Sequence, residues 1–132
     1  MDIDIKQYIK DIRKLRAQAD AYDDNAPGAI MEKIRLLTAA HMLIGRVSAV
    51  RDGEHARIYA ARKIAYAKAR KEAKRGEKEI AGDLAIEDLR MVEATALEEK
   101  MMWKNEFSSL REYIYELRLR VRVDMNTLGG GD

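Results

Sequence analysis

The chain has 132 residues, of which 47% are hydrophobic and 36% charged, and its formal net charge is +2. This length fits a single domain, and the hydrophobic content excludes a wholly disordered polymer. Because the chain contains no cysteine, it can form neither a disulfide framework nor a thiolate metal site. One proline, among many Ala, Leu, Glu, Lys and Arg residues, predicts an all-α protein with long helices.

Two helices are predicted before residue 53. Apolar residues recur every three or four positions over residues 5–15, as in an amphipathic helix. Pro27 then stands where a first helical residue would, because its missing N–H costs nothing at that position. The helix predicted from Pro27 to about Arg51 has apolar residues on two sides, so we expect it to be the central core helix. His41 lies on one of these apolar stripes and is interpreted as a hydrogen-bonded core histidine.

The dipeptide Asp52-Gly53 is a turn signal, and we expect the second helix to end there. Residues 1–52 are therefore interpreted as an N-terminal helical pair and residues 53–125 as a long helical hairpin. Residues 126–132, which include three consecutive glycines, are expected to form a flexible tail. The whole chain is expected to fold as one domain.

The sequence becomes strongly basic after residue 53. Residues 54–82 contain nine basic and four acidic residues, a local net charge of +5. On a helical projection, Ala, Ile and Tyr residues share one arc, and among the basic residues only Arg62 projects from it. The other eight are expected to face water: Arg57, Lys63, Lys68, Arg70, Lys71, Lys74, Arg75 and Lys78.

A long final helix is predicted from Ala85 onward. Its apolar residues alternate at spacings of three and four, which is typical of a coiled coil, and Glu99 is the one polar position in this seam. Residues 83–107 contain seven acidic and three basic residues, a net charge of −4, so an acidic segment follows the basic one. The sequence leaves open whether the chain turns at Gly76, turns at Gly82 or continues as one helix.

The seam of the final helix is predicted to be buried, either in the core or against another subunit. Long, narrow helices bury little area per residue, and coiled-coil helices often pack on a partner copy. We therefore expect a homo-oligomer. The residues assigned to the core or oligomer seam are Arg62, Leu89, Val92, Trp103, Phe107, Leu110, Ile114 and Leu117.

The usual arrangements of catalytic and metal-binding residues are absent from the sequence. The motifs of zinc proteases, thiol redox sites, serine hydrolases and phosphate-binding loops do not occur. Acidic pairs such as Glu98-Glu99 lie in a charge-rich segment, where solvated ion pairing is the usual role. We therefore expect no enzymatic activity, no catalytic or metal-ligating residue and no cofactor. No apolar run approaches the roughly 18 residues of a membrane span, so we expect a cytoplasmic protein without a membrane partner.

The basic helix gives the strongest indication of function. Its eight water-facing cations could neutralise a phosphate backbone, and Tyr59 or Tyr66 could stack on bases. In the alternative interpretation, residues 83–107 fold back onto the basic helix, the two charges cancel and the tyrosines pack in the core. Arg62 would then pair with Glu99 or another acid, or fix the register of an oligomer interface.

The second half of the chain resembles a family of phage proteins. Residues 56–69 read ARIYAARKIAYAKA and lead into a Lys/Glu-rich stretch, followed by MWKNEF at 102–107 and LREYI at 110–114. This order, over residues 54–122, resembles small helical phage proteins that accompany single-strand annealing or strand-exchange recombinases. It is similar in layout to the UvsY-type recombination mediators. The acidic block after Gly82 departs from the pattern, since it would repel a strand running along both helices.

The resemblance implies a protein that binds single-stranded DNA, forms rings and helps to load a recombinase onto strands coated by single-strand binding protein. We therefore expect a non-enzymatic, oligomeric recombination mediator with the eight cations facing DNA, located in the host cytoplasm if it is phage-encoded. A different class remains as an alternative: a protein-interaction module that docks or inhibits a host nuclease or defence system. A third possibility is a structural coiled-coil adaptor.

Overall fold

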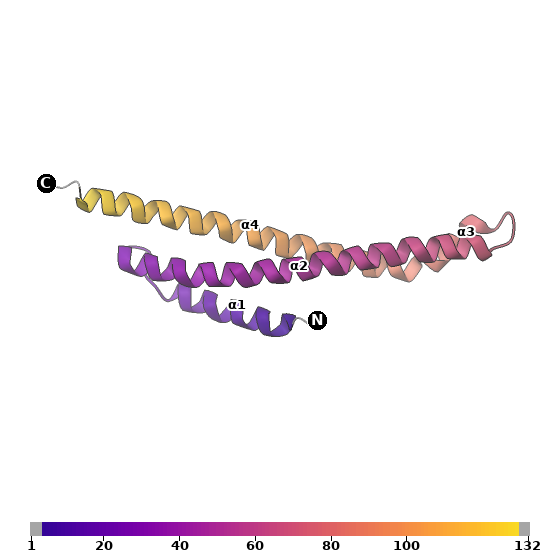
Figure 1. The fold of residues 1–132 in the computed structure, drawn as a ribbon, viewed down its shortest axis with the longest axis horizontal. Helices are drawn as coiled ribbons and strands as arrows, with labels where there is room; N and C mark the ends of the chain where they lie inside the picture. Colours follow the sequence, from indigo (N-terminus) through magenta and orange to yellow (C-terminus); the bar gives the residue numbers. More distant parts are fainter. Residues whose placement is uncertain (1–3, 130–132) are drawn as a thin grey trace. The chain divides into compact units, whose positions relative to one another are not determined.

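The computed structural model describes residues 4–129, apart from the side chains of residues 124, 125 and 127–129. In chain order it consists of α1 (Ile5–Asp20), α2 (Pro27–Glu72), α3 (Lys78–Ala85) and α4 (Glu87–Gly129) (Figure 1). Residues 4–129 contain no strand, and the predicted all-α class is confirmed. The tail expected at residues 126–132 lies partly outside the described residues, and up to residue 129 it continues α4.

The first two helices each begin at a residue suited to a helix start. The Asp4 carboxylate accepts a hydrogen bond from the N–H of Gln7 at 3.0 Å and so caps α1. Helix α2 begins at Pro27, as predicted. It does not end at Asp52-Gly53, however, and the predicted break is wrong. A glycine inside a helix costs only about 1 kcal/mol relative to alanine. Arg51, before Gly53, also pairs with Glu54, after it, at 3.0 Å, which favours the helical arrangement.

The chain divides into two compact units, which are described separately. Unit 1 comprises residues 1–48 and 103–132, and unit 2 comprises residues 49–102. Helices α2 and α4 each contribute a segment to both units.

Unit 1 has a core built from α1, the first part of α2 and the second part of α4. Both apolar stripes of α2 are buried, which confirms its predicted two-sided packing. Trp103 and Phe107 are partly buried and pack against this core. The buried residues are Ile12, Ala19, Ile30, Ile34, Leu36, Leu37, Ala40, Ile44, Val47, Leu110, Ile114, Leu117 and Val121.

His41 has the structural role predicted for it. Its ring stacks on Phe107, with the ring centroids 4.0 Å apart. Its Nε2 donates a hydrogen bond to the carbonyl oxygen of Phe107 at 3.0 Å. A Cβ at Gly45 would lie 3.1 Å from the Phe107 ring, so the absence of a side chain at Gly45 lets the ring approach α2 closely.

Unit 1 also contains a largely buried lysine. Lys33 is 6% exposed, and its Nζ donates a hydrogen bond to Asp24 Oδ1 at 2.7 Å. Arg120 Nη1 lies 4.0 Å from Asp24 Oδ2. The hydrogen bond from Lys33 lowers the pKa of Asp24, and the same bond raises the pKa of Lys33 against the opposing effect of burial.

Unit 2 is an antiparallel helix pair with a small interior. Arg51 Nη1 lies 3.0 Å from Glu99 Oε2, and Arg62 forms an ion pair with Glu93, so residue numbers rise along α2 as they fall along α4. Three residues of unit 2 are buried: Gly82, Ile86 and Ala96.

The turn of unit 2 answers the question that the sequence leaves open. Helix α2 ends at Glu72, and the N–H of Glu77 donates to the carbonyl oxygen of Lys74 at 3.0 Å. Gly76 takes a φ of +92° in this turn, a conformation that favours glycine. The chain therefore turns at Gly76, while Gly82 lies inside α3.

Gly82 is instead the place where α3 approaches α2. A Cβ at this position would lie 2.6 Å from Cε2 of Tyr66, so the tyrosine ring occupies the space that a side chain would need. Ile86, which is 1% exposed, separates α3 from α4. The final helix consequently begins at Glu87 and not at Ala85.

Candidate nucleic-acid interface

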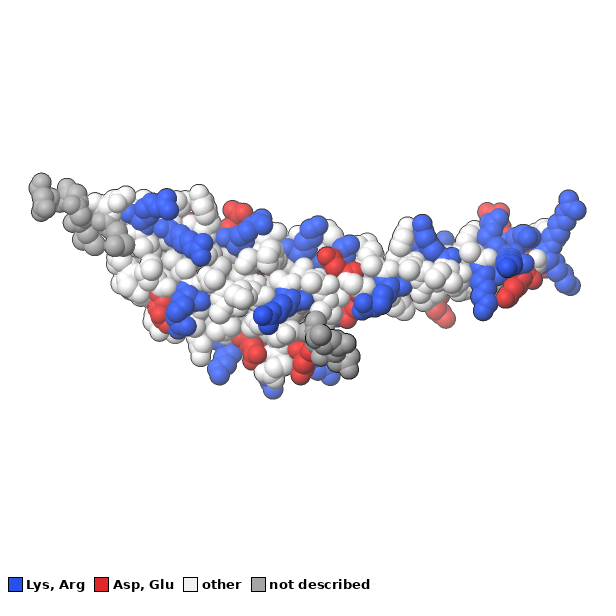
Figure 2. Space-filling view, in the orientation of Figure 1, with Lys and Arg blue, Asp and Glu red and all other residues white. Residues whose placement is uncertain are grey.

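All eight cations expected to face nucleic acid are exposed in unit 2. Figure 2 shows Lys and Arg side chains gathered at the end of this unit, where α2 turns into α3. The eight do not share one helix, because α2 ends at Glu72, whereas the basic segment of the sequence continues to residue 82. Five lie in α2 (Arg57, Lys63, Lys68, Arg70 and Lys71), two in the turn (Lys74 and Arg75), and Lys78 is the first residue of α3.

The five cations of α2 lie on two stripes. At about 100° per residue, Arg57, Lys68 and Lys71 fall within about 60° of one another. Lys63 and Arg70 fall about 20° apart, and about 120° around the helix from the first group. A nucleic-acid strand lying along α2 can therefore contact one stripe at a time, together with the cations of the turn.

The two tyrosines of this surface differ in their surroundings. Tyr59 is 40% exposed, with Lys63 Nζ 4.8 Å and the Arg62 guanidinium 5.3 Å from its ring centroid. The ring of Tyr66 packs at Gly82, and its hydroxyl accepts a hydrogen bond from Arg70 at 3.1 Å. Tyr59 thus keeps an exposed ring, whereas Tyr66 is held within the helix pair.

The acidic segment pairs with other cations than these eight. Glu93 pairs with Arg62 and Glu99 with Arg51, because the antiparallel register places these residues opposite each other. Lys100 Nζ lies 3.8 Å from Asp52. Within the described part of the chain, no ion pair of 4.0 Å or less involves any of the eight exposed cations. Helices α2 and α4 do fold back on each other. Acidic and basic side chains pair at the seam between them, whereas the eight exposed cations have no ion-pair partner among the described side chains.

Other acidic residues of unit 2 stand at helix starts. Glu79 lies in the first turn of α3, and Glu87 and Asp88 lie in the first turn of α4. There they interact favourably with the positive end of the helix dipole. Arg70 and Lys71 stand in the last turn of α2 and have the matching role at the negative end, so these two cations also stabilise the helix.

The predicted seam of α4 is buried unevenly. In unit 1, Leu110, Ile114 and Leu117 are at most 5% exposed. In unit 2, Leu89 is half-buried and Val92 is 49% exposed. The sequence does not predict the burial of Ile86, because this residue lies at the corner between α3 and α4, off the apolar stripe of α4. Its position next to a helix start was the available signal.

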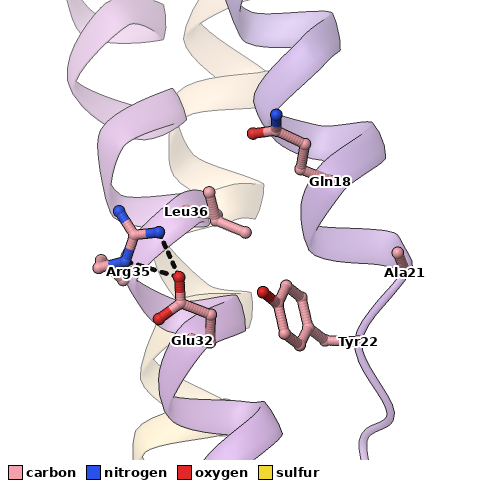
Figure 3. A pocket seen from close by; sticks show the side chains of 6 residues that line it. All are labelled: Gln18, Ala21, Tyr22, Glu32, Arg35 and Leu36. Carbon is pink, nitrogen blue, oxygen red and sulfur yellow. Dashed lines mark hydrogen bonds and ion pairs between the residues drawn. The ribbon is translucent and has the colours of Figure 1, made fainter.

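Unit 1 has an open cavity of about 420 Å³ between α1 and α2 (Figure 3). Within it, Arg35 Nε donates a hydrogen bond to Glu32 Oε1 at 2.8 Å. This bond lowers the pKa of Glu32, so the carboxylate is ionised near neutral pH and neutralised by its neighbour. The residues lining the cavity are Gln18, Ala21, Tyr22, Glu32, Arg35 and Leu36, which include no activated nucleophile.

Among the side chains that the structure describes, no group of three or more His, Asp or Glu residues is placed to hold a metal ion. No helix within residues 4–129 combines the length and the apolar character that a membrane crossing needs. Comparisons with protein-family models, curated proteins and solved structures found no match to the chain.

Proposed function

We propose that the protein is a non-enzymatic mediator of recombination that binds single-stranded DNA through the exposed cations of unit 2. The observation that carries the proposal is the division of charge in this unit. Glu93 and Glu99 pair with Arg62 and Arg51 at the seam, which leaves the eight outer cations without an ion-pair partner among the described residues and able to meet phosphates. The recombination role rests on the resemblance of residues 54–122 to phage mediators, with a recombinase or single-strand binding protein as partner.

Binding would proceed by counterion release. Each cation that neutralises a phosphate releases a condensed ion, so affinity falls with salt and depends little on base sequence. One stripe of α2 and the turn together offer four to six cations. If about four phosphates are contacted at once, the plot of log affinity against log salt has a slope of about −3.

Self-association would strengthen this binding. Several copies that hold one strand gain affinity through effective concentration, even when each copy contributes few contacts. Unit 2 supports an oligomer with coiled-coil packing, because it buries few side chains and leaves Ile64 68% and Met91 71% exposed.

A fluorescent oligo(dT) titration at low and moderate salt tests the proposal. The variant Lys71→Glu, Lys74→Glu, Arg75→Glu should bind at least tenfold more weakly than the wild type and with a shallower salt slope. A matched control, Lys10→Glu, Arg13→Glu, Lys14→Glu, makes the same change in net charge at exposed positions of α1, and should bind as the wild type does. Absence of wild-type binding even near about 50 mM salt would refute the proposal, and equal losses in both variants would refute the assigned site.

A second candidate is a protein-docking module that acts on a nuclease or defence factor. It is favoured by α3, where Ile80 and Leu84 lie one turn apart and are 65% and 66% exposed. The test measures whether the protein inhibits a purified single-strand exonuclease, at a salt concentration that suppresses binding of the protein itself to DNA. Inhibition that disappears in Ile80→Ser, Leu84→Ser would support this candidate over the first.

A further inference from the structure

Unit 2 has two exposed stripes with the same spacing. The α2 outer stripe consists of Arg57, Ala61, Ile64 and Lys68, at successive separations of four, three and four residues. The α4 outer stripe consists of Glu87, Met91, Ala94 and Glu98, at the same separations. All eight residues are exposed.

Both stripes point away from the seam inside unit 2. On a helical projection, the α2 outer stripe is rotated by about 120° from the seam residues of α2, and the α4 outer stripe by about 160° from those of α4. The two stripes of one copy therefore do not face each other. Each is an unpartnered face with a large apolar residue at its centre, Ile64 on α2 and Met91 on α4.

The stripes become complementary when two copies place them together in antiparallel order. With Ile64 opposite Met91, the register sets Ala61 opposite Ala94, where two small residues allow close approach. The same register sets cations opposite carboxylates at both ends: Arg57 opposite Glu98, and Lys68 opposite Glu87. Four consecutive layers match without a shift, because both stripes follow the alternation of an antiparallel coiled coil.

The charges also exclude pairing between identical stripes. Two α2 outer stripes would bring Arg57 and Lys68 against cations, and two α4 outer stripes would bring Glu87 and Glu98 against carboxylates. Like charges at close range oppose association. The stripes are therefore suited to a contact between unlike faces and unsuited to a symmetric dimer.

We propose that a second copy of this chain occupies these faces, with the α2 outer stripe of one copy packed antiparallel on the α4 outer stripe of the next. Each copy has one stripe of each kind, so the contact is head-to-tail and continues until it closes into a ring or extends as a filament. The hairpins of all copies point in the same direction, because neighbouring helices alternate in direction throughout. Their turns, with Lys74, Arg75 and Lys78, lie along one edge of the assembly.

This inference rests on the self-association in the proposed function and assigns the residues of its contact, which itself needs no nucleic acid. It also divides the eight cations between two tasks. Arg57 and Lys68 bind the neighbouring copy, whereas Lys63, Arg70, Lys71 and the cations of the turn remain for a nucleic-acid strand.

Sedimentation velocity of the full chain, without nucleic acid, tests the contact with two charge-reversed variants. One carries Arg57→Glu, Lys68→Glu, and the other carries Glu87→Lys, Glu98→Lys. Each alone has like charges across the contact and should sediment as a 15.1 kDa monomer, whereas the wild type sediments as a larger species. An equimolar mixture should associate again, because each reversed stripe then meets its complement on the other variant.

The control Lys63→Glu, Arg70→Glu makes the same charge change on another stripe of α2 and should assemble as the wild type does. A monomeric wild type, double variants that keep the wild-type mass, or a mixture that stays monomeric would each overturn the proposal. If a double variant loses its helical circular dichroism signal, Ile64→Ser and Met91→Ser replace it. Each should weaken association at least tenfold, and unchanged association would count against the contact. A monomer that still binds oligo(dT) would refute the assembly and leave the proposed function standing.

Discussion

Arg62 of α2 and Glu93 of α4 form an ion pair across the seam of unit 2, with side chains 23% and 18% exposed. The pair stands in a seam where few apolar residues are fully buried. Both charges are partly withdrawn from water, so loss of either partner leaves the other with an uncompensated desolvation cost. The pair therefore helps to set the register in which α2 and α4 meet.

Removal of one partner should destabilise unit 2 by about 1–3 kcal/mol, the cost of leaving a partly buried polar group without its partner. The variants Arg62→Ala, Glu93→Ala and their combination form a double-mutant cycle. The free energy of unfolding of each variant is measured in urea, with hydrogen exchange of the amides of unit 2 as the readout. We expect the double variant to be less destabilised than the sum of the single variants, and a coupling energy near zero would show that the pair does not hold the register.

Substitution by alanine should change the stability of the protein in opposite directions at two glycines of unit 2. Gly53 lies inside α2, where a Cβ would meet only the movable end of Arg57 at 3.3 Å, so Gly53→Ala should stabilise the protein by up to about 1 kcal/mol. Gly82→Ala gains the same helical preference but places its Cβ against the ring of Tyr66. It should lower the melting temperature, and Tyr66→Ala in the same chain should remove the clash. Stabilisation by Gly82→Ala would contradict the close approach of α3.

The buried seam of α4 should be sensitive to truncation in unit 1 and tolerant in unit 2. Leu117 is 0% exposed, and Leu117→Ala should cost about 2–5 kcal/mol because it removes packed methyl groups and leaves a cavity. Val92 is 49% exposed, and Val92→Ala should cost within about 0.5 kcal/mol. Urea unfolding of each variant measures the difference. Equal costs would mean that Val92 is covered in solution by another chain.

The Asp24–Lys33 pair should make unit 1 sensitive to acid. The hydrogen bond from Lys33 lowers the pKa of Asp24 in the folded state, so its contribution to stability is present above the ordinary value of 3.8 and is lost as the pH falls through the lowered value. Lys33 has a raised pKa, so its contribution persists below its ordinary value of 10.5 and is lost only as the pH rises above it. Asp24→Asn should remove part of the drop in melting temperature between pH 6 and pH 3, while the exposed control Asp20→Asn should keep the full drop.

The sequence predicts the elements of this fold better than their register. The apolar spacing of residues 5–15, the position of Pro27 and the two-sided pattern around Ile34 and Leu36 all reflect local preferences that the structure keeps. The break expected at Asp52-Gly53 is wrong, because the turn preference of a dipeptide is weaker than the contacts of a long helix. Arg51, one residue earlier, binds both Glu54 and Glu99.

In the candidate site, too, local features are easier to predict than the register of the two helices. The exposure of the five cations of α2 follows from helical periodicity, whereas Lys74 and Arg75 are exposed in a turn that the periodicity does not predict. The partners of the acidic residues do not follow from it either. The choice of Glu93 over Glu99 for Arg62 depends on the turn at Gly76 and on the corner at Ile86, which together fix how far α4 is displaced along α2. Neither feature has a periodic signal, so spacing alone cannot give the register.

The tyrosines provide a final prediction about nucleic-acid binding. A base that stacks on an aromatic side chain contributes about 1–3 kcal/mol, provided that a face of the ring is open. Tyr59 is 40% exposed and has Lys63 beside its ring, so Tyr59→Ala should weaken oligo(dT) binding by about 1–3 kcal/mol. Tyr66→Phe keeps the ring that packs at Gly82 and loses only the hydroxyl bound by Arg70, so its affinity should stay close to the wild type. Tyr115→Ala removes a tyrosine of unit 1 that is 59% exposed and is the control. A titration in which the variants at positions 59 and 115 lose the same affinity would mean that Tyr59 does not stack on a base.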